Sequence, residues 1–212
     1  MFSIIIPTWN NLALLQLCIR SIRQNSAHAH QIIVHVNDGS DGTLEWVREQ
    51  GITHTATPQN IGICLAVNEA AMHATQDYIL YLNDDMYCCP GWDTALVSKR
   101  WWFRVGGYSS EFSPGMSSDN DFSMKLWHAG CRVFLGVGDS LVYHFQCKST
   151  GKVKKNDGGK QFLNKWGMRQ SVFDRYYLRR GQPATTLALT EPEDTRELRW
   201  QMLRSRLKRA LG

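Results

Sequence analysis

The chain has 212 residues, of which 43% are hydrophobic and 20% are charged, and its formal net charge is +5. These values are typical of one globular domain with room for an extension. No apolar run approaches the roughly 20 residues of a transmembrane helix, so we expect none. The basic excess lies late, in residues 148–160 and 196–209. It suggests an anionic partner such as phosphate, a membrane surface or nucleic acid, although solvated surface is the simpler explanation of so small a net charge.

The cysteines and the N-terminal segment indicate a compartment. Six cysteines occur and none forms a C-x-x-C pair. A zinc site is therefore not expected, and reduced thiols in a cytoplasmic protein are the simpler interpretation. The segment Met1–Pro7 has neither a basic leader nor a cleavage site, so we expect a first strand there and no signal peptide.

Short apolar segments alternate with segments of helical periodicity from Phe2 to Leu82. This alternation predicts an α/β fold with a mainly parallel central sheet and right-handed crossovers. The predicted strands are 2–6, 31–36, 52–57 and 78–82, and the predicted helices are 12–22, 43–50 and one that ends near Ala74.

Polar residues follow every one of these strands. Because parallel strands place their carboxyl ends along one edge of the sheet, where ligands bind, we expect these residues to converge. The last strand stops on Asn83 and two carboxylates, Asp84 and Asp85, and carboxylate oxygens suit a hard divalent cation. Turn formation explains one such end equally well, but it explains all of them less well. The polar strand ends are Pro7-Thr8, Asp38, Asn60 and Asp84-Asp85.

The later part of the chain predicts fewer regular elements. Ser118 is a candidate N-cap for a helix that Gly130 ends. The other predicted elements are a short helix over 93–99, strands over 132–137 and 141–145, a helix over 161–179 and a linker over 184–192.

The final segment, 193–211, has the pattern of a basic amphipathic helix. Such a helix can lie on an anionic membrane surface, whereas packing on the domain or on a second subunit is the simpler expectation. Its apolar side consists of Trp200, Leu203, Leu207 and Leu211, and Arg196, Arg199, Arg206 and Lys208 lie largely elsewhere.

Several short motifs between residues 2 and 145 carry a family resemblance. They are Ser3-Ile4-Ile5-Ile6-Pro7-Thr8-Trp9-Asn10, Val36-Asn37-Asp38-Gly39-Ser40-Asp41-Gly42-Thr43, Asn60-Ile61-Gly62 with Asn68, Leu82-Asn83-Asp84-Asp85, Gly106-Gly107-Tyr108 with Glu111-Phe112, Ser118-Asp119-Asn120-Asp121-Phe122, and Val142-Tyr143-His144. In this order they resemble the motifs of the family 2 glycosyltransferases, which have the GT-A fold. The resemblance implies a GT-A domain over 1–180, with a nucleotide-binding half (1–85), an acceptor and catalytic half (86–145) and a basic loop and helix (146–180), followed by a linker and helix over 181–212.

The resemblance also implies a divalent metal, Mn²⁺ or Mg²⁺, at a D-x-D strand end. A metal held by one or two carboxylates neutralises a leaving diphosphate and keeps coordination sites open for its oxygens. Asn83 stands where the first Asp often stands and brings no charge. Asp85 is therefore expected as the direct ligand, His144 as a second ligand and Asp84 as a contact of the sugar or ribose. A structural role is the alternative for His144.

The nucleotide-sugar contacts implied by the resemblance lie mainly on the strand ends. Asp38 is expected to contact the nucleobase or ribose, and Lys148 to close over the diphosphate from a basic loop, which as an alternative is a solvated flap. The full set of expected contacts is Pro7, Thr8, Asn10, Asp38, Asn60, Gly62, Asn68, Asn83, Asp84 and Lys148.

An inverting transfer needs a general base for the acceptor hydroxyl, and Asp119 resembles the catalytic Asp of the family's E-D motif. Ser118 replaces the Glu of that motif. At a helix start the dipole favours the ionised carboxylate. Asp121 is the rival for this role, and a simple helix-terminal acid is the alternative for Asp119.

The implied function is transfer of a sugar from a UDP-, dTDP- or GDP-sugar to a hydroxyl of a glycan, lipid-linked or protein-glycan acceptor, as in cell-wall or glycan biosynthesis. The chain departs from the family in one respect, because only residues 86–105 separate the metal motif from Gly106-Gly107. A catalytically inactive GT-A-like binding or scaffold domain is therefore the alternative. A nucleotidyltransferase is disfavoured because its N-terminal Gly- and Lys-rich loop is missing, and no motif suggests nucleic-acid binding. The expected location is cytoplasmic, at the periphery of a membrane if the last helix binds one.

Overall fold

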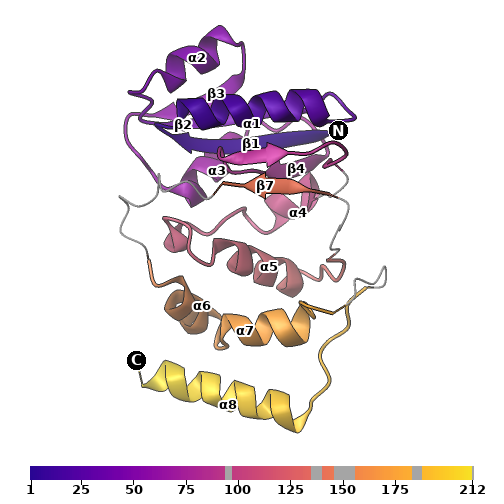
Figure 1. Ribbon diagram of the computed structural model, residues 1–212. Helices are drawn as coiled ribbons and strands as arrows, with labels where there is room; N and C mark the ends of the chain where they lie inside the picture. The colour runs from indigo at the N-terminus through magenta and orange to yellow at the C-terminus, as the bar shows by residue number, and fades with distance from the viewer. Residues whose placement is uncertain (94–96, 135–139, 146–155, 183–187, 212) are drawn as a thin grey trace.

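The computed structural model describes residues 1–93, 97–134, 140–145, 156–182 and 188–211 (Figure 1). In its N-terminal half, strands and helices alternate as the periodicity predicts. The strands are β1 (Phe2–Trp9), β2 (Gln31–Asn37), β3 (Thr53–Thr57) and β4 (Tyr78–Tyr81), and the helices are α1 (Leu12–Asn25), α2 (Thr43–Glu49) and α3 (Ile63–Ala71).

The main sheet has the strand order β3-β2-β1-β4-β6. Strands β1 to β4 are parallel, and β6 (Val97–Ser98) adds to β4 in the antiparallel direction. The fold is thus α/β with a mainly parallel central sheet, as predicted, and the carboxyl ends of β1 to β4 lie along one edge.

Side-chain alternation along the strands creates two cores, one on each face of the sheet. Ile4 of β1 and Val34 of β2 belong to the core under α1, whereas Ile5 and Ile33 belong to the core shared with α3. All four side chains are fully buried. Continuous apolar strands are expected where both faces are covered, and this is the reason the first strand contains Ile4, Ile5 and Ile6 in succession.

A second, small sheet supplements the main one. Strand β5 (Met86–Cys88) pairs in the antiparallel direction with β7 (Val142–His144), and Met86 lies opposite His144. β7 was predicted from the sequence and β5 was not, because three residues after a polar turn carry no periodic signal. This pairing brings residue 144 to the end of β4.

The remaining helices lie below the sheet, with α4 against β4 and β6, then α5, then α6 and α7, and α8 outermost (Figure 1). They are α4 (Lys99–Arg104), the 3₁₀ turn Ser110–Phe112, α5 (Ser118–His128), α6 (Gly158–Trp166), α7 (Gln170–Val172), the π-helical turn Phe173–Tyr177 and α8 (Arg196–Ala210).

Three of the predicted elements differ from the structure. The short helix expected over 93–99 is wrong, since residues 97–98 form a strand and the helix begins at Lys99. Residues 132–134 of the strand expected over 132–137 are not in a strand, and the rest lies outside the described residues. The helix expected over 161–179 is interrupted because Gly167 adopts a left-handed conformation with φ +70° that ends α6.

In the part of the chain that the structure describes, no helix combines the length and apolarity needed to cross a bilayer. The described cysteines are all free thiols.

Candidate active site

The ends of β1 and β4 are joined by a hydrogen bond between side chains. Thr8 is buried, and its Oγ1 donates to Asp84 Oδ2 at 2.7 Å. Burial raises the pKa of the Asp84 carboxyl to about 6, and the neighbouring charge of Asp85 acts in the same direction, while the Thr8 hydrogen bond opposes it. Asp84 is therefore fixed at the sheet edge, and its raised pKa means that it takes up a proton more readily than an exposed carboxylate.

Asp38 lies at the same edge, at the end of β2. The side-chain amide of Asn10 donates to Asp38 Oδ2 at 2.9 Å, and both residues are exposed and have positive φ angles. Behind them, the buried Asn37 donates to the Thr8 carbonyl at 3.3 Å and accepts from the Ile61 N–H at 2.9 Å. Asn37 thus ties together β1, β2 and the loop that follows β3.

Asp85 also lies at this edge, directly after Asp84, and its carboxylate is paired with the imidazole of His144. His144 Nε2 lies 3.0 Å from Asp85 Oδ1 and 3.3 Å from Asn83 Nδ2. The backbone sets this contact, because the Phe145 N–H donates to the Asp85 carbonyl at 3.0 Å and continues the β5–β7 ladder. Asp85 is buried, with 6% of its surface exposed, whereas His144 is exposed.

This pair fits a divalent metal bound together with a diphosphate. Within the described residues, no cluster of three or more His, Cys, Asp or Glu side chains is suited to hold a metal alone. A carboxylate and an imidazole nitrogen are, however, adequate protein ligands when phosphate oxygens and water complete the shell. The Nε2 atom of His144 already points at the carboxylate of Asp85.

The loop after β3 brings Asn60 and Gly62 to the same region. Asn60 Oδ1 accepts from the Gly62 N–H at 2.8 Å. A side chain at Gly62 would place its Cβ 2.0 Å from Ser113 Oγ, and φ is +79°, so only glycine fits there.

Pro7 is buried within β1, opposite His35 of β2.

Asp119 lies apart from the strand ends, in the first turn of α5, and is exposed. The Tyr108 hydroxyl donates to Asp119 Oδ1 at 2.9 Å. Tyr108 is itself fixed by Asn68, whose amide donates to the Tyr108 carbonyl at 2.7 Å and accepts from its N–H at 2.9 Å. Asn68 therefore supports Tyr108, and its expected contact with the donor stays a prediction.

Asp121, two residues further on, is fully buried and fully engaged. Its carboxylate accepts from Ser109 Oγ at 2.6 Å and from Trp166 Nε1 at 2.8 Å, and Lys165 Nζ lies 2.9 Å away. Such a carboxylate holds α5 against α6 and is not accessible to an acceptor. Of the two acids, Asp119 is the one whose carboxylate is exposed.

Tyr81, the last residue of β4, connects the strand ends with α5. Its ring packs edge-to-face on Tyr108, with 5.8 Å between ring centroids. Burial raises the pKa of Tyr81 well above its usual value, and the charges of Asp119, Asp84 and Asp85 add to this effect. Carboxylates of both the strand ends and α5 therefore act electrostatically on this one phenol.

Three residues of this site were given no role from the sequence. Tyr108 and Asn37 occur in the quoted motifs, but their hydrogen bonds link segments far apart in the chain, which a local pattern does not reveal. Tyr81 reads as an ordinary strand residue. The expected phosphate contact Lys148 lies outside the described residues.

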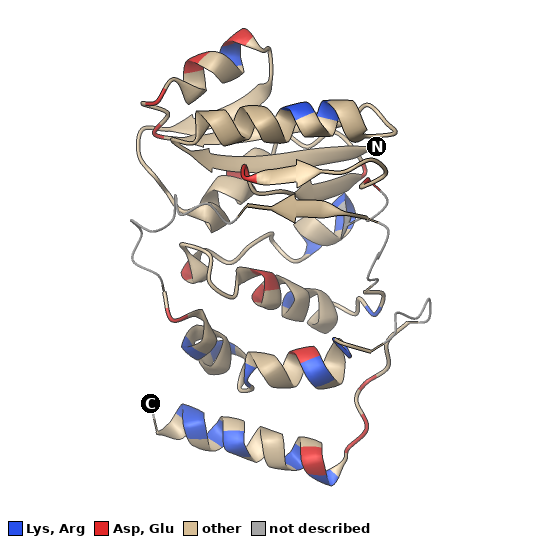
Figure 2. Ribbon diagram, in the orientation of Figure 1, with Lys and Arg blue, Asp and Glu red and all other residues tan. Residues whose placement is uncertain are grey.

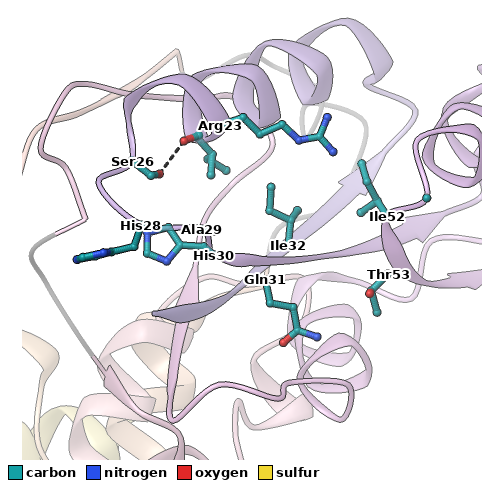
Figure 3. Close-up of a pocket in the computed structure, with 11 residues that line it drawn as sticks. Arg23, Ser26, His28, Ala29, His30, Gln31, Ile32, Ile52 and Thr53 are labelled. Atoms are coloured by element: carbon teal, nitrogen blue, oxygen red, sulfur yellow. Dashed lines mark hydrogen bonds between the residues drawn. The ribbon is translucent and has the colours of Figure 1, made fainter.

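A cavity of about 440 Å³ lies elsewhere, at the amino ends of β2 and β3 (Figure 3). Arg23, His28 and Gln31 line it from α1 and the start of β2. His30 also lines it, but His30 is occupied, since Nδ1 accepts from the Phe2 N–H at 3.1 Å and Nε2 lies 2.9 Å from Asp93. This cavity is on the edge opposite the carboxylates and plays no part in the site.

The family comparison covers the part of the chain that forms the sheet edge. Residues 3–99 match the model of Glycosyl transferase family 2. This match covers β1 to β4, the strand ends and Asp85, and it supports a glycosyl transfer function for a GT2-like chain over that part. It stops before Asp119 and His144. None of the curated proteins matches the sequence.

Solved structures support the fold over a longer stretch. A crystal structure of S. aureus TarS aligns with 100% of this chain and 43% of its own, at 12% identity and a TM-score of 0.59. The mannosyltransferase PcManGT from Pyrobaculum calidifontis, in complex with GDP-Man and Mn²⁺, aligns over 87% of this chain and 65% of its own, at 14% identity and a TM-score of 0.57. This chain is thus shorter than both, and at these identities the likeness shows the GT-A fold alone.

Proposed function

We propose that the protein is an inverting glycosyltransferase that moves a sugar from a nucleotide-diphospho-sugar to an acceptor hydroxyl. The observation that carries this proposal is the arrangement around Tyr81. The charges of the strand-end carboxylates Asp84 and Asp85 and of the exposed Asp119 all act on Tyr81, and Tyr108, whose ring packs on Tyr81, donates a hydrogen bond to Asp119. Donor binding and proton removal thus have separate groups within one site.

The donor would lie along the edge from β2 to β4. Asp38, exposed and oriented by Asn10, suits the ribose or base, and Asp84 suits a sugar or ribose hydroxyl because its position is fixed by Thr8. Asp85 and His144 would hold Mn²⁺ or Mg²⁺, with Asn83 near its water shell. A bound cation would neutralise the charge that develops on the leaving diphosphate.

Asp119 would act as the general base. As the acceptor oxygen attacks the anomeric carbon, its proton passes to the Asp119 carboxylate, and the bond to the diphosphate breaks with its electron pair on the departing phosphate oxygen. Tyr108 donates to Oδ1, which leaves Oδ2 to accept the proton. Attack opposite the leaving group inverts the anomeric centre.

The substrates are proposed by class. The GDP-Man and Mn²⁺ bound to the structurally similar mannosyltransferase support a nucleotide-diphospho-sugar and a divalent metal. The nucleotide would be UDP, dTDP or GDP, and the acceptor a glycan, a lipid-linked sugar or a protein glycan.

A catalytically inactive nucleotide-binding domain is the second candidate. Asn83 in place of an Asp and the short segment from β5 to α4, residues 86–104, favour it. Binding of nucleotide would then serve assembly or regulation and not transfer.

Isothermal titration with UDP, dTDP and GDP, each with and without Mn²⁺, tests the proposal first. We expect one nucleotide to bind more tightly with the metal. The absence of metal-dependent binding to all of them would reject the first candidate, and the absence of any nucleotide binding would reject both. Release of the nucleotide from the matching donor then separates the two, because slow donor hydrolysis occurs only in an active enzyme.

A further inference from the structure

Helix α8 has two opposite apolar sides, and only one of them packs on the protein. The packed side carries Leu198 and Ser205, which are 7% and 0% exposed, and it faces α6 and α7. Ser205 Oγ accepts from the Arg169 N–H at 3.3 Å, which fixes the helix on the segment before α7. These contacts fix the orientation of α8 on the domain, and its opposite side faces solvent.

The outer side carries the residues that the sequence pattern singles out. Trp200, Leu203, Leu207 and Leu211 are 53%, 46%, 51% and 88% exposed. At about 100° per residue, Trp200, Leu203 and Leu207 lie opposite Leu198 and Ser205. α8 packs on the domain, which is part of the simpler expectation from the sequence, but it does not do so through this apolar stripe. The domain is contacted by the other side of the helix.

Lys and Arg residues occur along the whole length of α8 (Figure 2). α8 contains six Lys and Arg residues and one acidic residue, Glu197. By helical position, Arg199 and Arg206 border one side of the stripe, and Arg204 and Lys208 the other. Among the described residues, the side chains of Arg204, Arg206 and Lys208 have no hydrogen-bond or ion-pair partner. Their charge is available to an external anion.

A groove beside the stripe is lined by both basic and apolar side chains. It has a volume of about 450 Å³ and is lined by Arg169, Arg204, Lys208, Leu207 and Leu211. Three cations next to two exposed leucines match the boundary between an anionic phospholipid headgroup and its acyl chains.

We propose that α8 lies on a membrane surface rich in anionic phospholipid, with the stripe in the interfacial region and a lipid phosphate in the groove. Apolar residues with an aromatic on one side and Lys and Arg beside them are the features of an interfacial helix. A second copy of the chain is a poorer occupant, because a two-fold contact through α8 would place its basic residues against each other. This proposal does not depend on glycosyl transfer.

Vesicle sedimentation with the whole chain tests the proposal. The two vesicle types are phosphatidylcholine alone and equal parts of phosphatidylcholine and phosphatidylglycerol. We expect binding to the anionic vesicles only, and weaker binding in 1 M salt, where the screening length falls to about 3 Å. Equal binding to both vesicle types, or binding to neither, would overturn the proposal.

Two variants and two controls assign the binding to α8. Trp200→Ser/Leu203→Ser/Leu207→Ser should abolish binding, and Arg204→Gln/Lys208→Gln should weaken it about 25-fold, since each basic side chain near an anionic surface contributes about fivefold. Met72→Ser/Phe103→Ser and Arg20→Gln/Arg48→Gln make the matched apolar and charge changes at exposed positions far from α8, and should bind normally.

Unchanged binding of the stripe variant would contradict the proposal. So would sedimentation velocity that shows a dimer of the wild-type chain and a monomer of the stripe variant without vesicle binding, because the stripe would then be an interface between copies. Near-ultraviolet circular dichroism verifies that each variant is folded.

Discussion

Acidic side chains occur in two regions of the site, and the two regions are built differently. At the sheet edge, parallel pairing brings Asp38, Asp84 and Asp85 together, and each rests on a neighbouring strand or loop. At the start of α5, two acids of the same turn have opposite environments. Asp119 is exposed with one hydrogen bond to a phenol, whereas Asp121 is buried with three partners. The sheet edge therefore offers carboxylates for donor binding, whereas α5 carries one exposed carboxylate, Asp119, and one structural carboxylate, Asp121.

Replacing the exposed acid should have the largest effect. Asp119→Asn should lower kcat roughly 1000-fold, because general base catalysis contributes on this scale, and should leave the melting temperature and nucleotide binding unchanged. Steady-state transfer assays measure kcat. Asp77→Asn, an equal change at an exposed position before β4, is the matched control. Full activity of Asp119→Asn would show that Asp119 is not the base.

Replacing the buried acid, Asp121, should lower the stability of the fold, which the Asp119 substitution should leave unchanged. Asp121→Asn should lower the free energy of unfolding by about 3 kcal/mol, because one of its two neutral donors loses an acceptor and Lys165 loses a buried partner. Urea unfolding followed by fluorescence measures this change. If stability is kept while kcat falls, Asp121 and not Asp119 is the base.

Removing the charge of Asp85 from the sheet edge should weaken metal-dependent nucleotide binding. Asp85→Asn should weaken Mn²⁺-dependent nucleotide binding roughly 100-fold and leave metal-independent binding unchanged, since losing a ligand costs at least as much as losing a residue behind it. Titration calorimetry with and without Mn²⁺ gives both values. His144→Ala should reproduce part of the loss. An effect equal with and without the metal would assign Asp85 to the nucleotide and not to the cation.

The sheet that supports this edge has its own pH dependence. His35 is fully buried between Thr55 and Thr57, and burial lowers its pKa to about 4. The unfolded chain, with a His pKa near 6.5, binds the proton more readily, so folding stability falls as the pH drops from about 6.5 to about 4. Between pH 7 and pH 5 the loss should be about 2 kcal/mol. Unfolding at both pH values, compared with His35→Gln, isolates this contribution, and an equal acid loss in the variant would contradict it.

The two regions also differ in how far the sequence predicts their structure. Convergence at the sheet edge follows from local patterns, since strand–helix alternation alone places Asp38 and Asp84 on one side of the sheet. The different environments of Asp119 and Asp121 do not follow, because both lie in the first turn of α5 and the partners of Asp121 come from other segments of the chain, namely Ser109, Lys165 and Trp166. The stripe on α8 was correctly assigned to one side of the helix, but which side packs depends on Ser205, a small residue that periodicity overlooks.

The link between the two regions gives the smallest predicted effect. Tyr108→Phe removes the hydroxyl that donates to Asp119 and keeps the ring that packs on Tyr81. We expect kcat to fall about tenfold, because the base loses its fixed orientation but keeps its charge, a change of about 1.4 kcal/mol in the barrier. KM for the donor should not change, since Tyr108 touches none of the strand-end carboxylates. Full kinetics at saturating donor and acceptor separate these quantities. A rise in donor KM with kcat intact would mean that the phenol serves the sheet edge, and that the two regions act as one binding surface.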